Sequence, residues 1–369
     1  MPELSVLAAP SRLYLDQLGD DVGLRGRVPG TPPADGHSYS TDDVCLGLRV
    51  DLMQALALGW ATVEPSVERG LRFLADAYDA EAGRFRSLRS AGGAWLDAPG
   101  SEDTNGRALL ALGSLIAECP DADLRQRAQT LFERALPTAS DLSGLRARAS
   151  LLLACDAAER GGSTGETSRI YQEVGNGLRQ SFEVRDVTFD WPWPELTLTG
   201  ENGLPAHALI VGGARLGYPR MLRMGVRAVE WLLTVQTADA GHLSLIGDAG
   251  GWPRGGIRAT ADQRPIEATT LLLAADAAWR ATGTARFRTG LEAAYAWFLG
   301  ANDVAGMVAD PARGACHDGI SAAGVLPGQG TEATLMWLMA AEVVRAHRAT
   351  TTTTTTTAPM ARDLASAPS

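Results

Sequence analysis

Carboxylates recur at the starts of predicted helices in this sequence, at spacings that repeat along the chain. Seven acids stand at or just before the first turn of such a helix: Asp42, Asp43, Glu102, Asp103, Glu201, Glu267 and Glu332. About 60 residues separate Asp43 from Asp103, and 66 and 65 residues separate the last three acids. If successive helices alternate in direction, these acids converge on a shared cleft at one end of the fold.

Two carboxyl groups on opposite sides of a glycosidic bond suffice for its hydrolysis. One protonates the leaving oxygen while the other activates water or attacks the sugar. The candidates for this catalytic pair are Asp103, Glu195, Glu201 and Asp262, with Asp43 as a further candidate. The alternative for each acid taken singly is helix capping, because a carboxylate answers the free N–H groups and the positive dipole end of a helix.

Capping does not explain the tryptophans beside these helix starts, which are Trp95, Trp191, Trp193 and Trp252. Aromatic faces stack on sugar rings, whereas carboxylates and arginines take the hydroxyl groups. The residues predicted to bind the substrate are Asp42, Asp43, Glu102, Arg107, Trp191, Trp193, Asn202, His242, Trp252, Arg254, Gln263, Glu267, Gln329 and Glu332. Core packing is the alternative for each tryptophan. A structural role is the alternative for His207 and His242, and an ion pair with Asp103 is the alternative for Arg107.

The elements that position these residues are helices, because apolar residues recur at spacings of three and four. The predicted helices span 42–60, 65–79, 104–118, 122–136, 140–160, 167–183, 202–217, 219–236, 265–282, 284–300 and 330–348. Long connections at 80–103, 184–201, 237–264 and 301–329 hold most of the tryptophans and glycines. Residues 1–40 form an irregular lead-in, residues 41–348 form the helical domain, and the threonine-rich tail 349–369 is expected to be disordered.

Composition excludes several classes of function. A net charge of -10 and a pI near 5.1 argue against nucleic-acid and membrane partners. The chain contains arginine but no lysine, which excludes lysine Schiff-base chemistry and a Walker A loop. The four cysteines show no CxxC spacing, so no metal site and no cofactor are predicted. Neither a transmembrane run nor a secretory signal is evident, which predicts a cytoplasmic protein.

Several of these segments resemble one family of bacterial six-hairpin, glycosidase-like proteins. Ser40 to Asp43 matches the start of its Ser-Thr-Asp-Asp-Asn-Ala-Arg pattern, which is then lost at Val44, Cys45 and Leu46. Ser101 to Arg107 matches Ser-Glu-Asp-x-x-Gly-Arg, and the segments around His242, Arg254 and Asp262 to Ala268 match further patterns of the family. Glu201 to Leu209 resembles a Glu-Asn-x-x-Leu-Pro helix start, with one residue, Gly203, between Asn202 and Leu204. The resemblance covers roughly residues 37–345.

The resemblance implies an all-α, (α/α)6 toroid with long loops over one end. The sequence shows eleven helices, so a twelfth is expected near Arg12 to Leu18. Members of the family are often fused to, or encoded beside, family 4-type glycosyltransferases, which implies such an enzyme as a partner.

Three hypotheses of function follow. The first is a glycoside hydrolase that acts on an oligosaccharide through paired carboxylates. The second is a non-catalytic, glycan-binding partner of a glycosyltransferase. The third is a sugar epimerase or isomerase on the same toroid.

Overall fold

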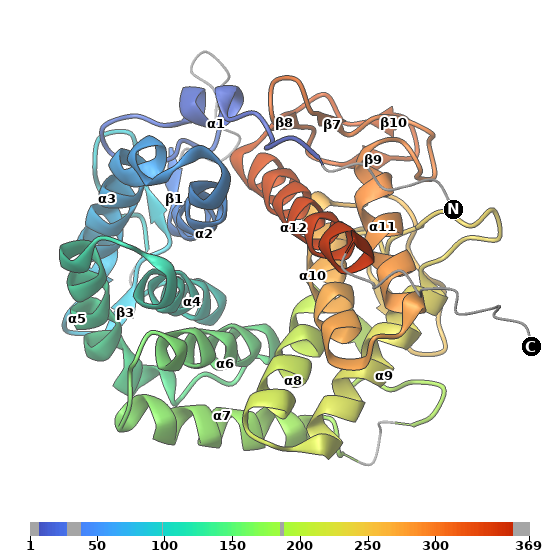
Figure 1. The fold of residues 1–369 in the computed structure, drawn as a ribbon, viewed down its shortest axis with the longest axis horizontal. Helices are drawn as coiled ribbons and strands as arrows, with labels where there is room; N and C mark the ends of the chain where they lie inside the picture. Colours follow the sequence, from blue (N-terminus) through green and yellow to red (C-terminus); the bar gives the residue numbers. More distant parts are fainter. Residues whose placement is uncertain (1–6, 28–37, 98, 185–187, 357–369) are drawn as a thin grey trace, which may run out of the picture.

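The computed structural model describes residues 7–27, 38–97, 99–184 and 188–356. Helices make up most of this part of the chain (Figure 1). They are α1 (Leu13–Leu18), α2 (Thr41–Leu58), α3 (Trp60–Ala77), α4 (Glu102–Glu118), α5 (Ala122–Ala139), α6 (Leu145–Arg160), α7 (Glu166–Ser181), α8 (Gly203–Arg215), α9 (Pro219–Val235), α10 (Pro265–Thr282), α11 (Ala285–Phe298) and α12 (Thr331–Thr356). The short helix α1 lies where the twelfth helix was expected.

The helices form two concentric rings around a common axis (Figure 1). The even-numbered helices α2 to α12 make the inner ring, in which each contacts the next and α12 contacts α2. The odd-numbered helices α3 to α11 lie outside, each packed against the inner helix before it in the chain. Helix α1 contacts α12, so the start of the chain completes the sixth pair. The prediction of an all-α, (α/α)6 toroid is confirmed.

Ten short strands lie in the loops and pair as five two-stranded antiparallel ladders. The pairs are β1 (Tyr39–Ser40) with β4 (Leu88–Arg89), β2 (Tyr78–Asp79) with β3 (Arg84–Phe85), β5 (Thr197–Leu198) with β6 (Trp252–Pro253), β7 (Ala309–Asp310) with β8 (Ala315–Cys316), and β9 (Ile320–Ser321) with β10 (Gly324–Val325). Two of these ladders join loops that are distant in sequence. They therefore fix the long connections over the ring.

Three predicted boundaries are wrong by five residues or more. Helix α3 begins at Trp60 instead of residue 65. Helix α6 begins at Leu145 instead of residue 140, because residues 140–144 form a turn whose N–H groups are bound by Glu102. Helix α12 continues beyond residue 348 to Thr356, into the threonine run that was predicted to be disordered. Within it, the Thr350 hydroxyl donates a hydrogen bond to the Ala346 carbonyl one turn earlier. Residues 357–369 lie outside the described part, as do residues 1–6 and 28–37 of the predicted lead-in.

Inner helices are buried around most of their circumference, since they have an outer helix on one side and inner neighbours on the others. Helix α4 buries almost every residue from Thr104 to Ile116, whereas the outer helix α9 buries one stripe. Among the described residues, no helix combines the length and apolarity needed to cross a membrane.

A close approach of two inner helices yields a testable prediction. Gly113 of α4 faces α6 so closely that an added Cβ would lie 2.4 Å from the Ala154 carbonyl oxygen. We expect Gly113→Ala to lower the free energy of unfolding by about 1–3 kcal/mol in urea titrations, because backbone must move. The matched control is Gly177→Ala in the outer helix α7, where no atom lies within 4 Å. This change should raise stability by about 0.5–1 kcal/mol. Equal stability of the two variants contradicts the packing argument.

Candidate functional site

All six inner helices begin at the same end of the ring, because an outer helix follows each of the inner helices α2 to α10 and leads the chain back to the start of the next one. Their first turns carry the polar residues of the candidate site. These are Asp42 and Asp43 on α2, Asp103 and Arg107 on α4, Arg146 on α6, Glu201 and Asn202 before α8, Glu267 on α10 and Glu332 on α12.

Arg107 joins acids from two other elements. Its Nη1 donates to Asp42 Oδ2 at 2.6 Å, and its Nη2 donates to Glu201 Oε1. Two carboxylates on one planar guanidinium lie no farther apart than the roughly 5–10 Å at which glycosidase carboxylates act. The predicted alternative for Arg107, an ion pair with Asp103, is not formed, although Asp103 still contributes to the electrostatic field at Arg107.

Five carboxyl groups surround this one cation. We call Asp42, Asp43, Asp103, Glu201 and Glu332 the carboxylate cluster. Burial, reinforced by the neighbouring acids, raises the pKa of Asp43, Glu201 and Glu332, while Arg107 opposes the rise in each. The same acids raise the pKa of Arg107 in spite of its burial. Asp43, Glu201 and Glu332 therefore hold their protons to higher pH than isolated carboxyl groups do.

Two members of the cluster have the properties of a site that contacts a ligand. Glu332 is exposed to solvent, and desolvation by the surrounding protein still raises its pKa. Its carboxyl group makes no hydrogen bond within the described chain. Asp42 Oδ1 is buried and has no hydrogen-bond partner among the described residues. An incoming hydroxyl group could donate to it.

A second layer holds Glu201 in place. Glu201 has a φ of 55°, which is uncommon outside glycine. Glu267 of α10 accepts hydrogen bonds from the backbone N–H of Glu201 and, at 3.2 Å, from Asn202 Nδ2. Burial raises the pKa of Glu267 to about 8, although the N–H donors act in the opposite direction. Glu267 and Asn202 are both buried, so we assign them to positioning instead of direct binding.

Arg146 completes this layer and was not identified from the sequence. It donates to the Gly200 carbonyl, to Asn202 Oδ1 at 3.3 Å and to Glu195 Oε1 at 3.1 Å. Glu195 also accepts from Trp193 Nε1 at 3.1 Å. The predicted catalytic role of Glu195 thus gives way to a structural one, because its carboxylate anchors the loop that carries Glu201. The predicted helix began at residue 140, so Arg146 was not expected at a helix start beside the acids.

The predicted stacking role is wrong for two of the tryptophans. Trp193 is fully buried and Trp191 is 4% exposed, so neither ring offers a free face to a sugar. Trp193 packs edge-on against Phe182, and Trp191 packs edge-on against Trp231 and Trp252. Trp252 is partly exposed, although it stacks on Trp231. These aromatic contacts fix residues 191–193 against the core next to the site.

Glu102 caps a neighbouring helix instead of lining the cleft. Its carboxylate accepts from the backbone N–H groups of Ser143 and Gly144, at 2.9 and 2.7 Å, just before α6. These bonds outweigh partial burial and lower the pKa of Glu102. The prediction that it binds substrate is therefore wrong, and the capping alternative holds.

We expect Glu102→Ala to reduce the free energy of unfolding by about 1–2 kcal/mol at pH 7, because the α6 N-terminus loses its acceptor. Because the pKa of Glu102 is lower in the folded protein than in the unfolded chain, its carboxylate stabilises the fold at pH values above the unfolded-state pKa. This stabilisation is lost as the pH falls through the folded-state pKa. The difference from the wild type should therefore shrink below about pH 4. Urea unfolding at both pH values measures this, with Glu102→Gln as the control that keeps one acceptor oxygen. A constant difference contradicts the assignment.

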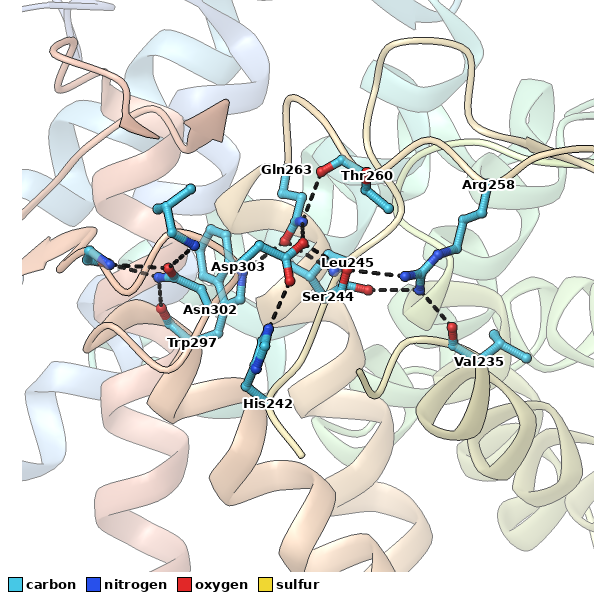
Figure 2. Close-up of polar contacts among 12 residues, drawn as sticks. Val235, His242, Ser244, Leu245, Arg258, Thr260, Gln263, Trp297, Asn302 and Asp303 are labelled. Carbon is cyan, nitrogen blue, oxygen red and sulfur yellow. Dashed lines mark hydrogen bonds and ion pairs between the residues drawn. The ribbon is translucent and has the colours of Figure 1, made fainter. Parts of the chain in front are cut away.

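His242 and Gln263 belong to a separate network centred on Asp303 (Figure 2). Asp303 accepts from Gln263 Nε2 at 2.5 Å and from Ser244 Oγ at 2.7 Å, and it pairs with His242 Nε2 at 2.8 Å. These contacts lower the pKa of Asp303 against the effect of burial. Arg258 binds the Val235 and Ser244 carbonyls beside it. The network ties the loop before α10 to the loop after α11.

The remaining predicted residues lie in loops over the same end of the ring. Asp262 has a φ of 60°, and its carbonyl accepts from the Asp248 N–H. Arg254 donates to Thr188 Oγ1 at 3.0 Å. The Gln329 carbonyl accepts from the Tyr14 hydroxyl at 2.8 Å. Among the described residues, no hydrogen bond or ion pair joins the Asp262 carboxylate to the carboxylate cluster. The catalytic role of Asp262 stays a prediction.

A cavity continues from the carboxylate cluster along the ring axis. All six inner helices line it, and its volume is about 30 Å³, enough for a group the size of a water molecule or a small ion. Arg107 and Glu201 stand at the cluster side, and most other lining residues are leucine, isoleucine, threonine and methionine. Arg49 and His207 are the further charged or titratable residues in this lining. Among the described residues, no three or more His, Cys, Asp and Glu side chains are grouped to hold a metal ion.

Comparison with known proteins supports the fold at low sequence identity. No protein-family model and no curated protein matches the sequence. Cellobiose 2-epimerase from Spirochaeta thermophila superposes with a TM-score of 0.67 at 13% identity, covering 92% of this chain and 93% of that one. A D-mannose isomerase gives 0.67 at 13% identity, with 91% and 94% covered. The GH76 alpha-mannanase of Bacteroides thetaiotaomicron gives 0.60 at 9% identity, with 92% and 95% covered.

The chain thus shares its toroid with sugar epimerases, sugar isomerases and glycoside hydrolases. At these identities the similarity establishes the fold and not the reaction.

Proposed function

We propose that this protein is a carbohydrate-active enzyme that hydrolyses a glycosidic bond in an oligosaccharide. The observation that carries the proposal is the carboxylate cluster around Arg107, where acids from four inner-ring positions share one cation at the mouth of an axial cavity. Paired acids of different proton affinity are what glycoside hydrolysis requires. The glycoside hydrolase among the structural neighbours shows that this toroid can support such chemistry.

The geometry favours Glu332 as the general acid. Its raised pKa keeps it protonated at higher pH than an ordinary glutamate, and its carboxyl group is exposed and makes no internal hydrogen bond. It can therefore donate a proton to the leaving oxygen. Asp103 is partly exposed and also makes no side-chain hydrogen bond in the described chain, so we assign it the role of base or nucleophile. Asp42, Glu201 and Arg107 hold the sugar hydroxyl groups between them.

The surroundings of the histidines favour hydrolysis over epimerisation as the reaction of this protein. An epimerase must remove a proton from carbon, a task that suits a base with a pKa near neutrality. Of the histidines that the structure describes, His242 pairs with Asp303 and His347 pairs with Asp276. His317 lies in the loop between β8 and β9, with its Nδ1 buried and without a hydrogen-bond partner. His207 lines the axial cavity, and burial lowers its pKa to about 4. None of these contributes to the electrostatics of Arg107 or Glu201.

The test uses three probes in deuterated buffer: alpha-mannan, cellobiose and D-mannose. We expect new reducing ends from alpha-mannan or from a panel of related oligosaccharides, and no deuterium at C2 of cellobiose or D-mannose. The double variant Asp103→Asn, Glu332→Gln serves as the inactive control. Deuterium incorporation without new reducing ends overturns hydrolysis in favour of an epimerase or isomerase. Glycan binding by calorimetry with no turnover favours the non-catalytic partner of a glycosyltransferase. A cytoplasmic location stays a prediction.

A further inference from the structure

Arg49 lies in the middle of α2, in the lining of the axial cavity. Its guanidinium makes no hydrogen bond and no ion pair of 4 Å or less with any described residue, and Arg49 is partly exposed in the cavity wall. Burial lowers its pKa, and Glu118 attracts its charge only from a distance. A cation in such a place is costly unless an anion or a ring of acceptors faces it.

The acid in the cavity lining, Glu201, is bound by Arg107 and does not pair with Arg49. Leu46, Leu110, Leu153 and Met339 are apolar, as are most of the other side chains in the lining. His207 of α8 lies in the same wall, and its Nδ1 is buried without a partner. With its pKa lowered to about 4, His207 is neutral near pH 7, and a neutral imidazole carries one N–H that can be directed into the cavity.

We propose that the axial cavity is an anion-binding site, in which the Arg49 guanidinium and a ring N–H of His207 hold a small anionic group. The five N–H donors of a guanidinium suit chloride, carboxylate and phosphate oxygen alike. A tightly bound cation is excluded, because Arg49 would repel it.

The anion can come from two sources. It can be a free ion such as chloride, held below the carboxylate cluster. It can also be an acidic group carried by the glycan, because Arg107 and Glu201 line the upper part of the same cavity. A sugar bound at the cluster would then extend its acidic group towards Arg49. This second source rests on the proposed function, whereas the first does not.

The free-ion arm is tested by thermal unfolding in sodium chloride and in sodium gluconate at equal ionic strength. If the wild type binds chloride, its Tm should rise by about 2 °C once chloride exceeds its Kd tenfold. Arg49→Met should lose this difference. Arg223→Met is the control, because Arg223 is exposed and lies outside the cavity. Should Arg49→Met fail to fold, an anomalous bromide peak between Arg49 and His207 in crystals of the wild type tests the same site.

The glycan arm compares binding of D-glucuronate and D-glucose by calorimetry. An acidic group that reaches Arg49 should make glucuronate bind at least tenfold more tightly than glucose, and Arg49→Met should abolish the preference. A response in either arm that depends on Arg49 supports the site. The proposal is overturned if chloride, bromide and glucuronate all fail to distinguish the wild type from Arg49→Met. Because the chloride arm needs no turnover, a failure of the proposed hydrolysis leaves this result interpretable.

Discussion

Replacing Arg107 by methionine is expected to lower kcat/KM about 10³-fold on a glycan that turns over by the proposed hydrolysis. The change removes the cation that Asp42 and Glu201 share, at the point where charge develops during bond cleavage. It also leaves partly buried carboxylates without a counterion, since the side chains of Arg107 and Glu201 are 17% and 13% exposed. We therefore expect the free energy of unfolding at pH 7 to fall by about 3–5 kcal/mol.

The pH dependence distinguishes this cause from a general packing defect. Without Arg107, the pKa values of Asp43, Glu201 and Glu332 rise further above those of the unfolded chain. A group whose pKa is raised in the folded protein stabilises the fold at pH values below its unfolded-state pKa. This stabilisation is lost as the pH rises through its folded-state pKa. The variant should therefore be relatively less destabilised at pH 5 than at pH 8 in urea titrations.

Arg107→Lys is the matched control, because lysine keeps the charge but cannot bond both acids in a fork. It should recover most of the stability and only part of the activity. An Arg107→Met enzyme with kcat/KM within about threefold of the wild type would contradict the assignment of the site.

The toroid was predictable because its physical causes are local and repeated. Apolar residues at spacings of three and four specify the helices, and short turns between them specify antiparallel pairs. The position of the acids followed from the same regularity: helices that alternate in direction bring every second N-terminus to one end. Asp42 and Glu201, 159 positions apart in the sequence, thus meet at Arg107.

The orientation of loop side chains was not predictable in this way. Nothing in Asp190-Trp-Pro-Trp-Pro-Glu195 specifies which side of the loop faces the core, and burial of both tryptophans is decided by Phe182, Trp231 and Trp252 from other segments. Arg146 escaped notice for a related reason, since its partners lie about fifty residues away.

The same limit applies to acids at helix starts. Glu102 and Asp103 are adjacent on α4, and yet one caps α6 while the other remains without a hydrogen bond. Sequence cannot separate them, because their roles depend on a neighbouring helix.

Replacing Glu332 by glutamine is expected to lower kcat about 10²–10⁴-fold with little change in KM, because the amide fills the same space but has no acidic proton to donate. A general acid with a raised pKa must be protonated to act. The wild type should therefore lose activity as pH rises through that pKa, and the variant should lack this alkaline limb. Rates measured on one natural-type oligosaccharide across pH 4–9 provide the comparison.

Leaving-group ability separates proton donation from a structural effect of Glu332→Gln. A dinitrophenyl glycoside departs without protonation, so the variant should hydrolyse it at close to the wild-type rate if binding is intact. Glu342→Gln is the control, because Glu342 lies on the same helix with a raised pKa but pairs with Arg345, and its variant should keep full kcat. Equal losses on the activated and the natural-type substrate would show that Glu332 positions the sugar instead of protonating it, and Asp43, whose pKa burial also raises, would become the candidate acid.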